Sequence, residues 1–404
     1  MGSYCDYKIG KWEIETSKSY IIPELTIAFQ EADKKTGFTE NEDGKYRYIK
    51  YECTAEIARM RLDALGYTIK NAENILLNTR EKWIKDYGYS LPTTPKGIKK
   101  CFLKSNINDW IEAYRLIREN NYKYGYLYKN EWDLDTTPDL VRIALETDET
   151  YYGFPANAPY IFRLFLESCP KSLPVTLDIS ELVNSGYYNF KEKVCETNNF
   201  ASKVIIITEG STDKEFLELS LQLLFPHMVD CYTFIDFSTF SVSGGVDKVT
   251  HIVKTFSGTG IQNKIIALFD NDAVGVREYI SLKKLKLPSN ITVLKLPDIH
   301  IATEYPTIGP TGNVKTNVNG KACSLELYFG VDVLKSLNGE YEPIVWGGYI
   351  DSVVGYQGQV RNKSTIQDNF RKKVDWTKRN KGRLKQKDWS GFQLVWEHIF
   401  NAYK

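Results

Sequence analysis

Two aspartates separated by one residue, Asp270 and Asp272, follow directly after the apolar run "IIALF" at 265–269. Side chains at positions i and i+2 of an extended segment point to the same side, so the two carboxylates can share one cation. Another acid, Glu209, follows the β-branched run "VIII", and Asp213 comes four residues after it. Carboxylate oxygens are hard ligands that suit Mg²⁺ or Mn²⁺. The pattern therefore predicts a divalent metal site.

The elements that position these acids are strands and helices in alternation. Strand patterns occur at 203–210, 231–238, 264–270 and 291–298, with helical patterns after the first three. This alternation predicts an open α/β sheet with mostly parallel strands. In such a sheet functional groups gather beyond the carboxyl ends of the strands, which places Glu209, Asp236 and Asp270 at one edge. Thr212 and Glu215 fit a capping box at the start of the first helix.

Each acidic motif also has a simpler structural interpretation. An aspartate after a strand is often a helix cap, and a Glu-Gly pair is common at turns. Both motifs at successive strand ends of one α/β unit form a more specific pattern. Four carboxylates close together raise each other's pKa values unless a cation neutralises them. The combination therefore favours a metal site over separate caps and turns.

Composition sets broad limits on the 404-residue chain. Lys and Arg number 52 and Asp and Glu 51, so the overall charge gives no support for a polyanion partner, although a local basic patch suffices for one. The seven cysteines form no CxxC pair, which argues against a structural zinc site or a disulfide framework. We see no signal peptide, myristoylation signal or membrane-spanning run. We expect a soluble cytoplasmic protein without a membrane partner.

Changes in composition and in hydrophobic periodicity along the chain suggest four regions. We expect a mainly helical α+β N-terminal domain at 1–170, a connector at 171–202, the α/β domain at 203–335, and an α-rich C-terminal extension at 336–404 packing on it. Within the first, "YKIGKWEIETS" alternates as a short hairpin does. Thr54 is a candidate cap for a helix that ends near Gly66.

The acidic stretches resemble a known family. "VIIITEGSTDKEFLE" followed by "IIALFDNDAVG" looks like a Toprim domain, which has a Rossmann-like α/β fold. The spacing of Glu209 and Asp213 resembles that of OLD-family nucleases, and "NGKACSLELYFG" offers their further Ser-x-Glu element. The resemblance implies two divalent metal ions bound by six residues: Glu209, Asp213, Asp270, Asp272, Ser324 and Glu326.

The remaining chain is similar to HEPN/Toprim-associated proteins of bacterial defence loci. Their N-terminal region begins much like "MGSYCDYKIGKWEIETSKSYIIPEL", and their C-terminal region resembles "VVGYQGQVRNKSTIQDNF". The resemblance implies a metal-dependent endonuclease that acts as an anti-phage, abortive-infection effector on DNA or on RNA, including tRNA. The Arg-x4-6-His motif of HEPN ribonucleases is missing, because none of the four histidines lies in the N-terminal region. A second nuclease site is therefore not expected.

Phosphodiester cleavage also requires a cation near the developing negative charge. Lys363 and its neighbour Arg361 are candidates, and we assign the catalytic role to Lys363 because nuclease relatives place a lysine downstream of the acidic motifs. For either residue alone, a solvated surface position is the simpler interpretation. The cation run with two Trp at 371–389 can contact a nucleic-acid backbone, although such runs are mostly solvated. For His300 and Glu304 a structural role is favoured.

Several alternatives stay open. The acidic site can be vestigial, in which case the protein is a binding or scaffold subunit. A third hypothesis is a receiver or phosphatase-like α/β fold, which the Glu-Gly and Ser-x-Glu elements disfavour. Primase or topoisomerase functions fit the sequence less well than a nuclease. Glu209 serves either as general base or only as a metal ligand. No GxxxxGK[ST] motif occurs, so an ATPase or sensor partner would be a separate protein. Homo-oligomerisation is also open.

Overall fold

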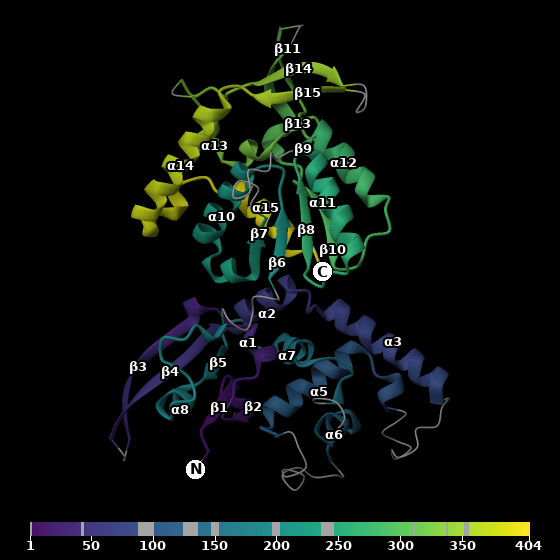
Figure 1. Cartoon of the computed structure of the whole chain (residues 1–404), viewed down its shortest axis with the longest axis vertical. Coiled ribbons are helices and arrows are strands. Elements are labelled where there is room, and N and C mark those ends of the chain that lie inside the picture. Colours follow the sequence, from purple (N-terminus) through teal and green to yellow (C-terminus); the bar gives the residue numbers. More distant parts are fainter. Residues whose placement is uncertain are drawn as a thin grey trace. The chain divides into compact units, whose positions relative to one another are not determined.

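The computed structural model forms two compact units, Met1–Ser202 with Tyr403–Lys404, and Lys203–Ala402 (Figure 1). Each unit is described by itself. The structure describes residues 2–41, 44–87, 101–123, 136–146, 153–195, 203–235, 246–309, 312–336, 338–350 and 355–404. Asp236, which we expected at the acidic edge, lies outside these residues.

The N-terminal unit is built on a five-stranded antiparallel sheet. Its order is β2-β1-β5-β4-β3, with the strands Tyr4–Ile9 (β1), Trp12–Lys18 (β2), Lys34–Asn41 (β3), Gly44–Thr54 (β4) and Pro174–Asp178 (β5). The predicted hairpin corresponds to β1 and β2, whose alternate residues are buried as the period-two pattern requires. We expected a mainly helical domain with one short hairpin, so a five-stranded sheet is more β-structure than the sequence predicted. The outer parts of β3 and β4 bury few side chains and so lack the apolar alternation that identifies strands.

Helices complete the N-terminal unit. They are Pro23–Thr26 (α1), Ala55–Ala64 (α2), Ile69–Tyr87 (α3), Ile107–Glu119 (α5), Asp139–Glu146 (α6), Ala158–Glu167 (α7) and Ser180–Asn184 (α8). The predicted cap is present, because the Thr54 side chain accepts a hydrogen bond from the Ile57 N–H at 3.3 Å. Gly66 follows α2 with φ +82°, a conformation that favours glycine.

The expected connector at 171–202 is instead part of this unit. It contributes β5, which lies between β1 and β4 in the middle of the sheet, and α8, which packs on β4. The prolines and polar residues around this short strand resemble a linker in the sequence. Pairing with two strands far away in the chain is what makes the segment a central strand.

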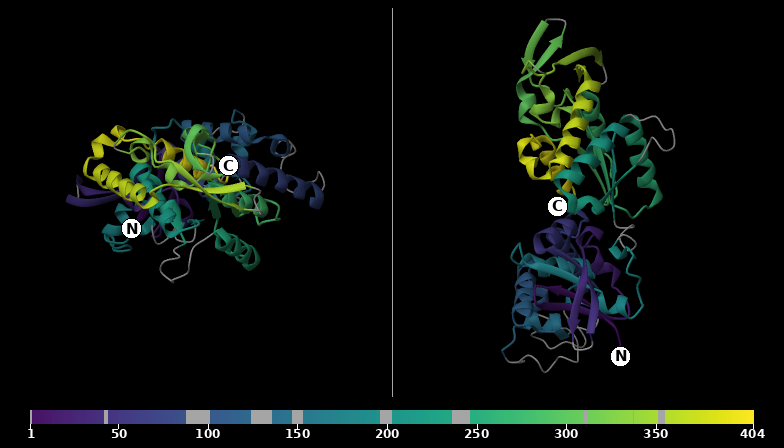
Figure 2. Two further views of the ribbon diagram at one scale, coloured as in Figure 1. Left: turned by 90° about the horizontal axis from the view of Figure 1, so that it is seen from above. Right: turned by 90° about the vertical axis from the view of Figure 1, so that its left-hand side faces the viewer.

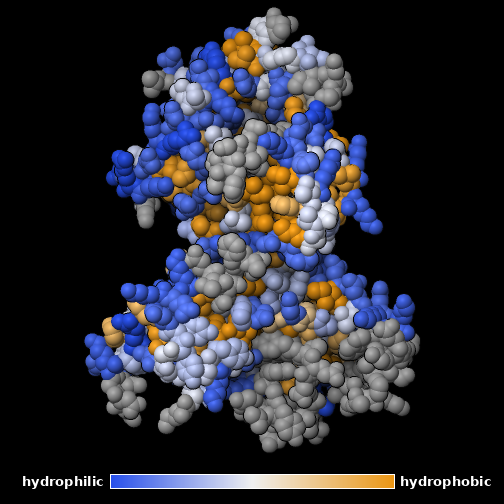
Figure 3. Space-filling view, in the orientation of Figure 1, coloured by the Kyte–Doolittle hydropathy of each residue, from blue (hydrophilic) through white to orange (hydrophobic). Residues whose placement is uncertain are grey.

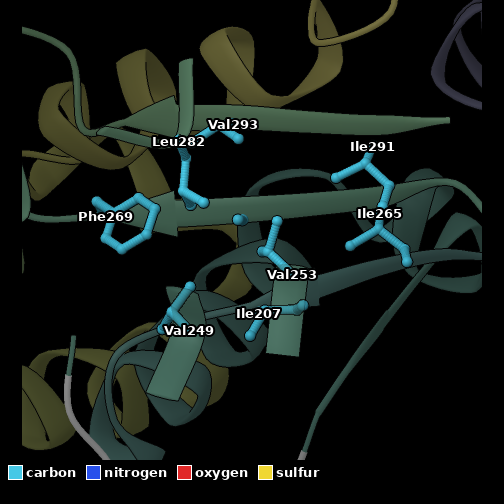
Figure 4. Close-up of a cluster of buried hydrophobic side chains, with 9 residues drawn as sticks. Ile207, Val249, Val253, Ile265, Phe269, Leu282, Ile291 and Val293 are labelled. Atoms are coloured by element: carbon cyan, nitrogen blue, oxygen red, sulfur yellow. The ribbon is translucent and has the colours of Figure 1, made fainter. Parts of the chain in front are cut away.

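The second unit contains the predicted parallel sheet. Its order is β10-β8-β6-β7, with Val204–Ile207 (β6), Tyr232–Phe234 (β7), Ile265–Phe269 (β8) and Ile291–Lys295 (β10). Three helices accompany it: Ser211–Leu224 (α10), Val246–Thr259 (α11) and Ala273–Lys283 (α12). Val249 and Val253 of α11 and Leu282 of α12 pack against side chains of β6, β8 and β10 in one buried cluster (Figure 4). The fully buried β8 explains its continuous apolar run.

The rest of this unit mixes strands and helices. A second sheet has the order β12-β11-β14-β15, formed by Tyr305–Gly309 (β11), Gly312–Thr316 (β12), Ile344–Ile350 (β14) and Gly355–Val360 (β15). The helices are Val331–Leu334 (α13), Lys363–Arg379 (α14) and Ser390–Phe400 (α15). This sheet crosses the boundary expected at residue 335, because β14 from the C-terminal extension pairs with β11.

The C-terminal helices α14 and α15 contact α10 of the α/β part. In Figure 2, α14 and α15 lie beside α10. Arg371 of α14 forms an ion pair with Glu215 of α10 at 2.7 Å, and the Trp396 indole of α15 donates to the Ser220 hydroxyl at 2.9 Å. All seven cysteines are free thiols. No helix in the described ranges is both long and apolar enough to cross a bilayer.

Candidate functional site

The site begins where two neighbouring parallel strands end. β6 ends at Ile207 and β8 at Phe269, so Glu209 and Asp270 emerge at the same edge of the sheet. The Asp270 N–H donates a hydrogen bond to Glu209 Oε1 at 2.9 Å. This bond ties the two strand ends together and confirms that the two predicted acids lie side by side.

Asp213 joins them from the first turn of α10. Its carboxylate accepts a hydrogen bond from the Gly210 N–H at 2.9 Å, so Gly210 is the N-cap of this helix. The predicted capping box of Thr212 and Glu215 is therefore wrong. The helix begins two residues earlier than that box requires, and Glu215 turns to Arg371.

Asp272 is held from two sides. One carboxylate oxygen accepts a hydrogen bond from the Gly275 N–H at 2.7 Å, which makes Asp272 the N-cap of α12. The other accepts from the Gln357 side-chain amide of β15. The helix-cap interpretation of Asp272 is therefore confirmed, and its role as a metal ligand stays a prediction.

A short two-stranded pairing brings the Ser-x-Glu element to the aspartates. Asn271–Asp272 (β9) pairs antiparallel with Ala322–Cys323 (β13), just before Ser324. The Ser324 hydroxyl donates to Glu326 Oε2 at 2.6 Å, and Glu326 is only 1% exposed. The two predicted motifs, more than fifty residues apart in the chain, therefore meet in the fold.

A lysine reaches the same buried carboxylate. Lys363 is the first residue of α14, and its Nζ lies 3.0 Å from Glu326 Oε1. The Gln367 amide, one turn later, donates to the same oxygen at 2.8 Å. Of the two candidate cations, Lys363 lies at the acids, whereas Arg361 pairs with Glu342 at 3.3 Å.

Burial and mutual repulsion dominate the electrostatics of these acids. Burial, followed by the charges of Asp272 and Asp213, raises the pKa of Glu209 to about 8, against the lowering effect of the Asp270 N–H. Burial and Glu326 raise the pKa of Asp213 to about 6. The pKa of Asp270 is raised well above its ordinary value, by burial first and then by its acidic neighbours. The pKa of Lys363 is raised, because Glu326 and the other acids outweigh the lowering effect of burial.

Two neighbouring residues matter that the sequence interpretation missed. A Cβ atom on Gly275 would collide with the Asp270 carbonyl, so only glycine lets α12 start this close to the acids. Asn271, fully buried between the aspartates, donates to Asp298 at 2.9 Å and accepts from Lys295 at 3.0 Å. Two features of the sequence could have indicated these residues: the small residues "AVG" at the start of α12 for Gly275, and the polar Asn271 directly after a buried strand.

The donor set suits a hard cation, but it is engaged with protein groups. A small pocket lies between Glu209, Asp213 and Asp270. Gln357 Oε1, beside Asp272, is buried and has no hydrogen-bond partner among the described residues. Over the same part of the chain, no group of three or more His, Cys, Asp or Glu side chains is arranged to hold a metal ion. Metal binding by Asp272 or Glu326 would require these two carboxylates to exchange their present partners.

Other candidates from the sequence do not join this group. His300 and Glu304 lie on the exposed ends of a short 3₁₀ helix and make no described side-chain contact with the acids. In the basic run at 371–389, Arg371 pairs with Glu215 and Lys373 is buried against Asp332 at 2.8 Å. These two cations therefore stabilise the unit internally, whereas Lys372, Lys378, Arg379, Arg383 and Lys385 are exposed.

Comparison with known proteins gives one match. The family model for "HEPN/Toprim N-terminal domain 1" matches residues 1–202, which is half of the chain. No curated protein and no solved structure matches. The matched range coincides with the N-terminal unit and ends just before β6. The chain therefore belongs to the HEPN/Toprim N-terminal domain 1 family.

Proposed function

We propose that the protein is a metal-dependent nuclease of the Toprim type that cleaves phosphodiester bonds of DNA or RNA. The observation that supports it best is the group of acids at the ends of β6 and β8, where burial, followed by the charges of neighbouring acids, raises the pKa values of Glu209, Asp213 and Asp270. Such repulsion is costly in a merely structural site and is relieved by a cation. Membership in the HEPN/Toprim family points in the same direction.

The proposed ligands of Mg²⁺ or Mn²⁺ are the acids and the hydroxyl of the predicted motifs. They are Glu209, Asp213, Asp270, Asp272, Ser324 and Glu326, sufficient for a two-metal site. When bound, such ions lower the pKa of a water nucleophile and stabilise the charge of the phosphate.

Two groups of the chain have further roles in this proposal. Glu209, whose Oε1 is held by the Asp270 N–H at 2.9 Å, serves either as the general base or only as a metal ligand. Lys363, held at 3.0 Å from Glu326, supplies positive charge next to the site where negative charge develops.

A catalytically silent scaffold is the second candidate, and one observation favours it. The Asp272 carboxylate is occupied by Gly275 and Gln357, and Glu326 by Ser324, Gln367 and Lys363. A site neutralised in this way can persist without a metal ion.

The test is cleavage of plasmid DNA and of total tRNA by the purified full chain in Mg²⁺, Mn²⁺ or EDTA. We expect metal-dependent cleavage that falls at least about 100-fold in Asp270→Asn. Asp247→Asn, which changes an exposed carboxylate on α11, is the matched control and should retain activity. Lys363→Met should lower cleavage but keep metal-induced thermal stabilisation, because it removes charge and no proposed ligand.

Two results decide between the candidates. Neither cleavage nor a metal-induced rise in the unfolding temperature would favour the silent scaffold. Metal binding without cleavage would indicate a nuclease that needs a trigger, a separate ATPase or a sensor subunit. We also propose an anti-phage role, which predicts that expression in cells is toxic and that Asp270→Asn removes the toxicity.

A further inference from the structure

The N-terminal sheet carries a row of aromatic and cationic side chains that the acidic site does not use. The row consists of Lys34 and Phe38 on β3, Lys45 and Arg47 on β4, and Phe190 after α8. Phe38 lies directly opposite Arg47 in the strand register, so the two side chains share one face of the hairpin. We call these five residues the aromatic–cation row.

The members of the row alternate in space. Lys45 Nζ lies 5.0 Å and Arg47 Cζ 5.2 Å from the centre of the Phe38 ring. The same guanidinium lies 4.1 Å from the Phe190 ring, and Lys34 Nζ lies 5.8 Å from it. Contacts of this kind hold long side chains in place and leave ring faces and charges ordered.

The row is partly exposed. Phe38 and Lys45 are exposed, whereas Lys34 and Arg47 are half-buried, and Lys34 Nζ donates to the Phe190 and Glu192 carbonyls at 3.1 and 3.0 Å. Phe38 is 57% and Phe190 37% exposed, unusual values for phenylalanine. Among the described residues none of Lys34, Lys45 and Arg47 forms an ion pair, and Glu40 opposite Lys45 is the acid nearest in register. Figure 3 shows hydrophilic and hydrophobic side chains side by side over β3 and β4.

The opposite face of the same hairpin differs in its charges. There Lys35 pairs with Glu52, and Lys50 pairs with Asp178 at 3.2 Å. Cations next to carboxylates have little attraction left for a polyanion. Among the described residues of this hairpin, the cations without a carboxylate partner therefore lie on the face that also presents the two phenylalanines.

We propose that the aromatic–cation row binds single-stranded nucleic acid, with bases stacked on Phe38 and Phe190 and phosphates next to Lys34, Lys45 and Arg47. Exposed rings between cations are the arrangement that binds unpaired bases and their backbone. A duplex hides its base faces and offers only phosphates to such a surface. Because the row lies on the N-terminal sheet, this proposal is independent of the metal site.

The test measures binding alone. Full-length protein carrying Asp270→Asn is titrated in EDTA against fluorescein-labelled 20-nucleotide single-stranded RNA, single-stranded DNA of the same sequence, and duplex DNA, by fluorescence anisotropy. We expect single-stranded RNA, single-stranded DNA or both to bind more tightly than duplex DNA. The single strand with the lower Kd shows whether the row prefers ribose or deoxyribose. In Phe38→Ala/Arg47→Ala the Kd for single strands should rise about tenfold or more. Arg47→Ala alone should also flatten the salt dependence, by about 0.7 in the log–log slope.

The matched control is Tyr46→Ala/Lys50→Ala, which removes one ring and one cation from the opposite face. Phe38→Leu tests the ring itself with less risk to folding, and thermal unfolding verifies that each variant is folded. An equal loss in the control, a preference for duplex, or unchanged binding in the row variants would overturn the proposal. Because no cleavage is measured, none of these results bears on the nuclease.

Discussion

The two units differ in how the charges of their ionisable side chains are balanced. In the N-terminal unit two buried arginines pair with carboxylates, the fully buried Arg61 with Asp33 and Arg163 with Asp63 at 2.7 Å, while the buried Arg80 donates to the Ser105 hydroxyl at 2.7 Å. In the second unit Glu209, Asp213, Asp270 and Glu326 gather around a single lysine. Paired buried charges serve the stability of a fold, whereas an excess of one sign marks a place where a ligand of opposite charge would relieve repulsion.

The comparison is most strongly tested by breaking a pair. Arg61→Met leaves the Asp33 carboxylate without its partner, and we expect a loss of about 3–5 kcal/mol in the free energy of unfolding. Arg115→Met, which removes exposed ion pairs to Glu112 and Glu119, should cost far less, because exposed ion pairs contribute little to stability. Denaturant unfolding measures both, and equal losses would contradict the importance of the buried pair.

The excess of acid predicts a particular pH dependence. The pKa of Glu209 is raised from 4.5 to about 8, so the folded protein binds the proton more tightly than the unfolded chain. Stability is therefore highest below about pH 4.5 with respect to this group and falls as the pH rises toward 8, by up to a few kcal/mol. Unfolding temperatures in EDTA from pH 5 to 8.5 should decrease less steeply in Glu209→Gln. Parallel curves would show that Glu209 does not carry the effect.

Two glycines of the second unit, one in α12 beside the acids and one in α11 away from them, allow a further comparison. Gly275→Ala places a methyl group against the Asp270 carbonyl, and we expect a loss of about 1–3 kcal/mol together with impaired cleavage. Gly258→Ala in α11 meets open space and should be neutral or stabilising by up to about 1 kcal/mol. Thermal unfolding of both variants checks this, and a destabilised Gly258→Ala would mean that glycine matters there for another reason.

The smallest expected change in stability is a gain rather than a loss. Asp270→Asn removes one repelling charge, so in EDTA at pH 8 the variant should be more stable than the wild type by about 0.5–2 kcal/mol. Adding Mg²⁺ should stabilise the wild type and leave the variant unchanged. A destabilised Asp270→Asn in EDTA would indicate that the carboxylate serves the fold.

Much of the local structure could be predicted because it depends on short stretches. The run before Asp270 identifies β8, and the positions of Glu209 and Asp270 at strand ends follow from strand–helix alternation. Errors arose where two local options compete, as with the cap of α10, or where strands lack apolar alternation, as in β3 and β4. The central position of β5 could not be seen in its own residues.

The sequence by itself determined the parallel α/β unit, the acids at its edge and the candidate metal chemistry, because these depend on side-chain type and on periodicity within a few residues. The family resemblance groups Ser324, Glu326 and Lys363 with the aspartates, and only the tertiary structure decided how they meet: Ser324 and Glu326 through the pairing of β9 with β13, and Lys363 by its contact with Glu326. The contact of Gln357 with Asp272 was not expected from the sequence. The tertiary structure also decided that Phe190 joins the row of β3 and β4. Such contacts depend on chain pairing over tens to more than a hundred residues, which no local pattern encodes.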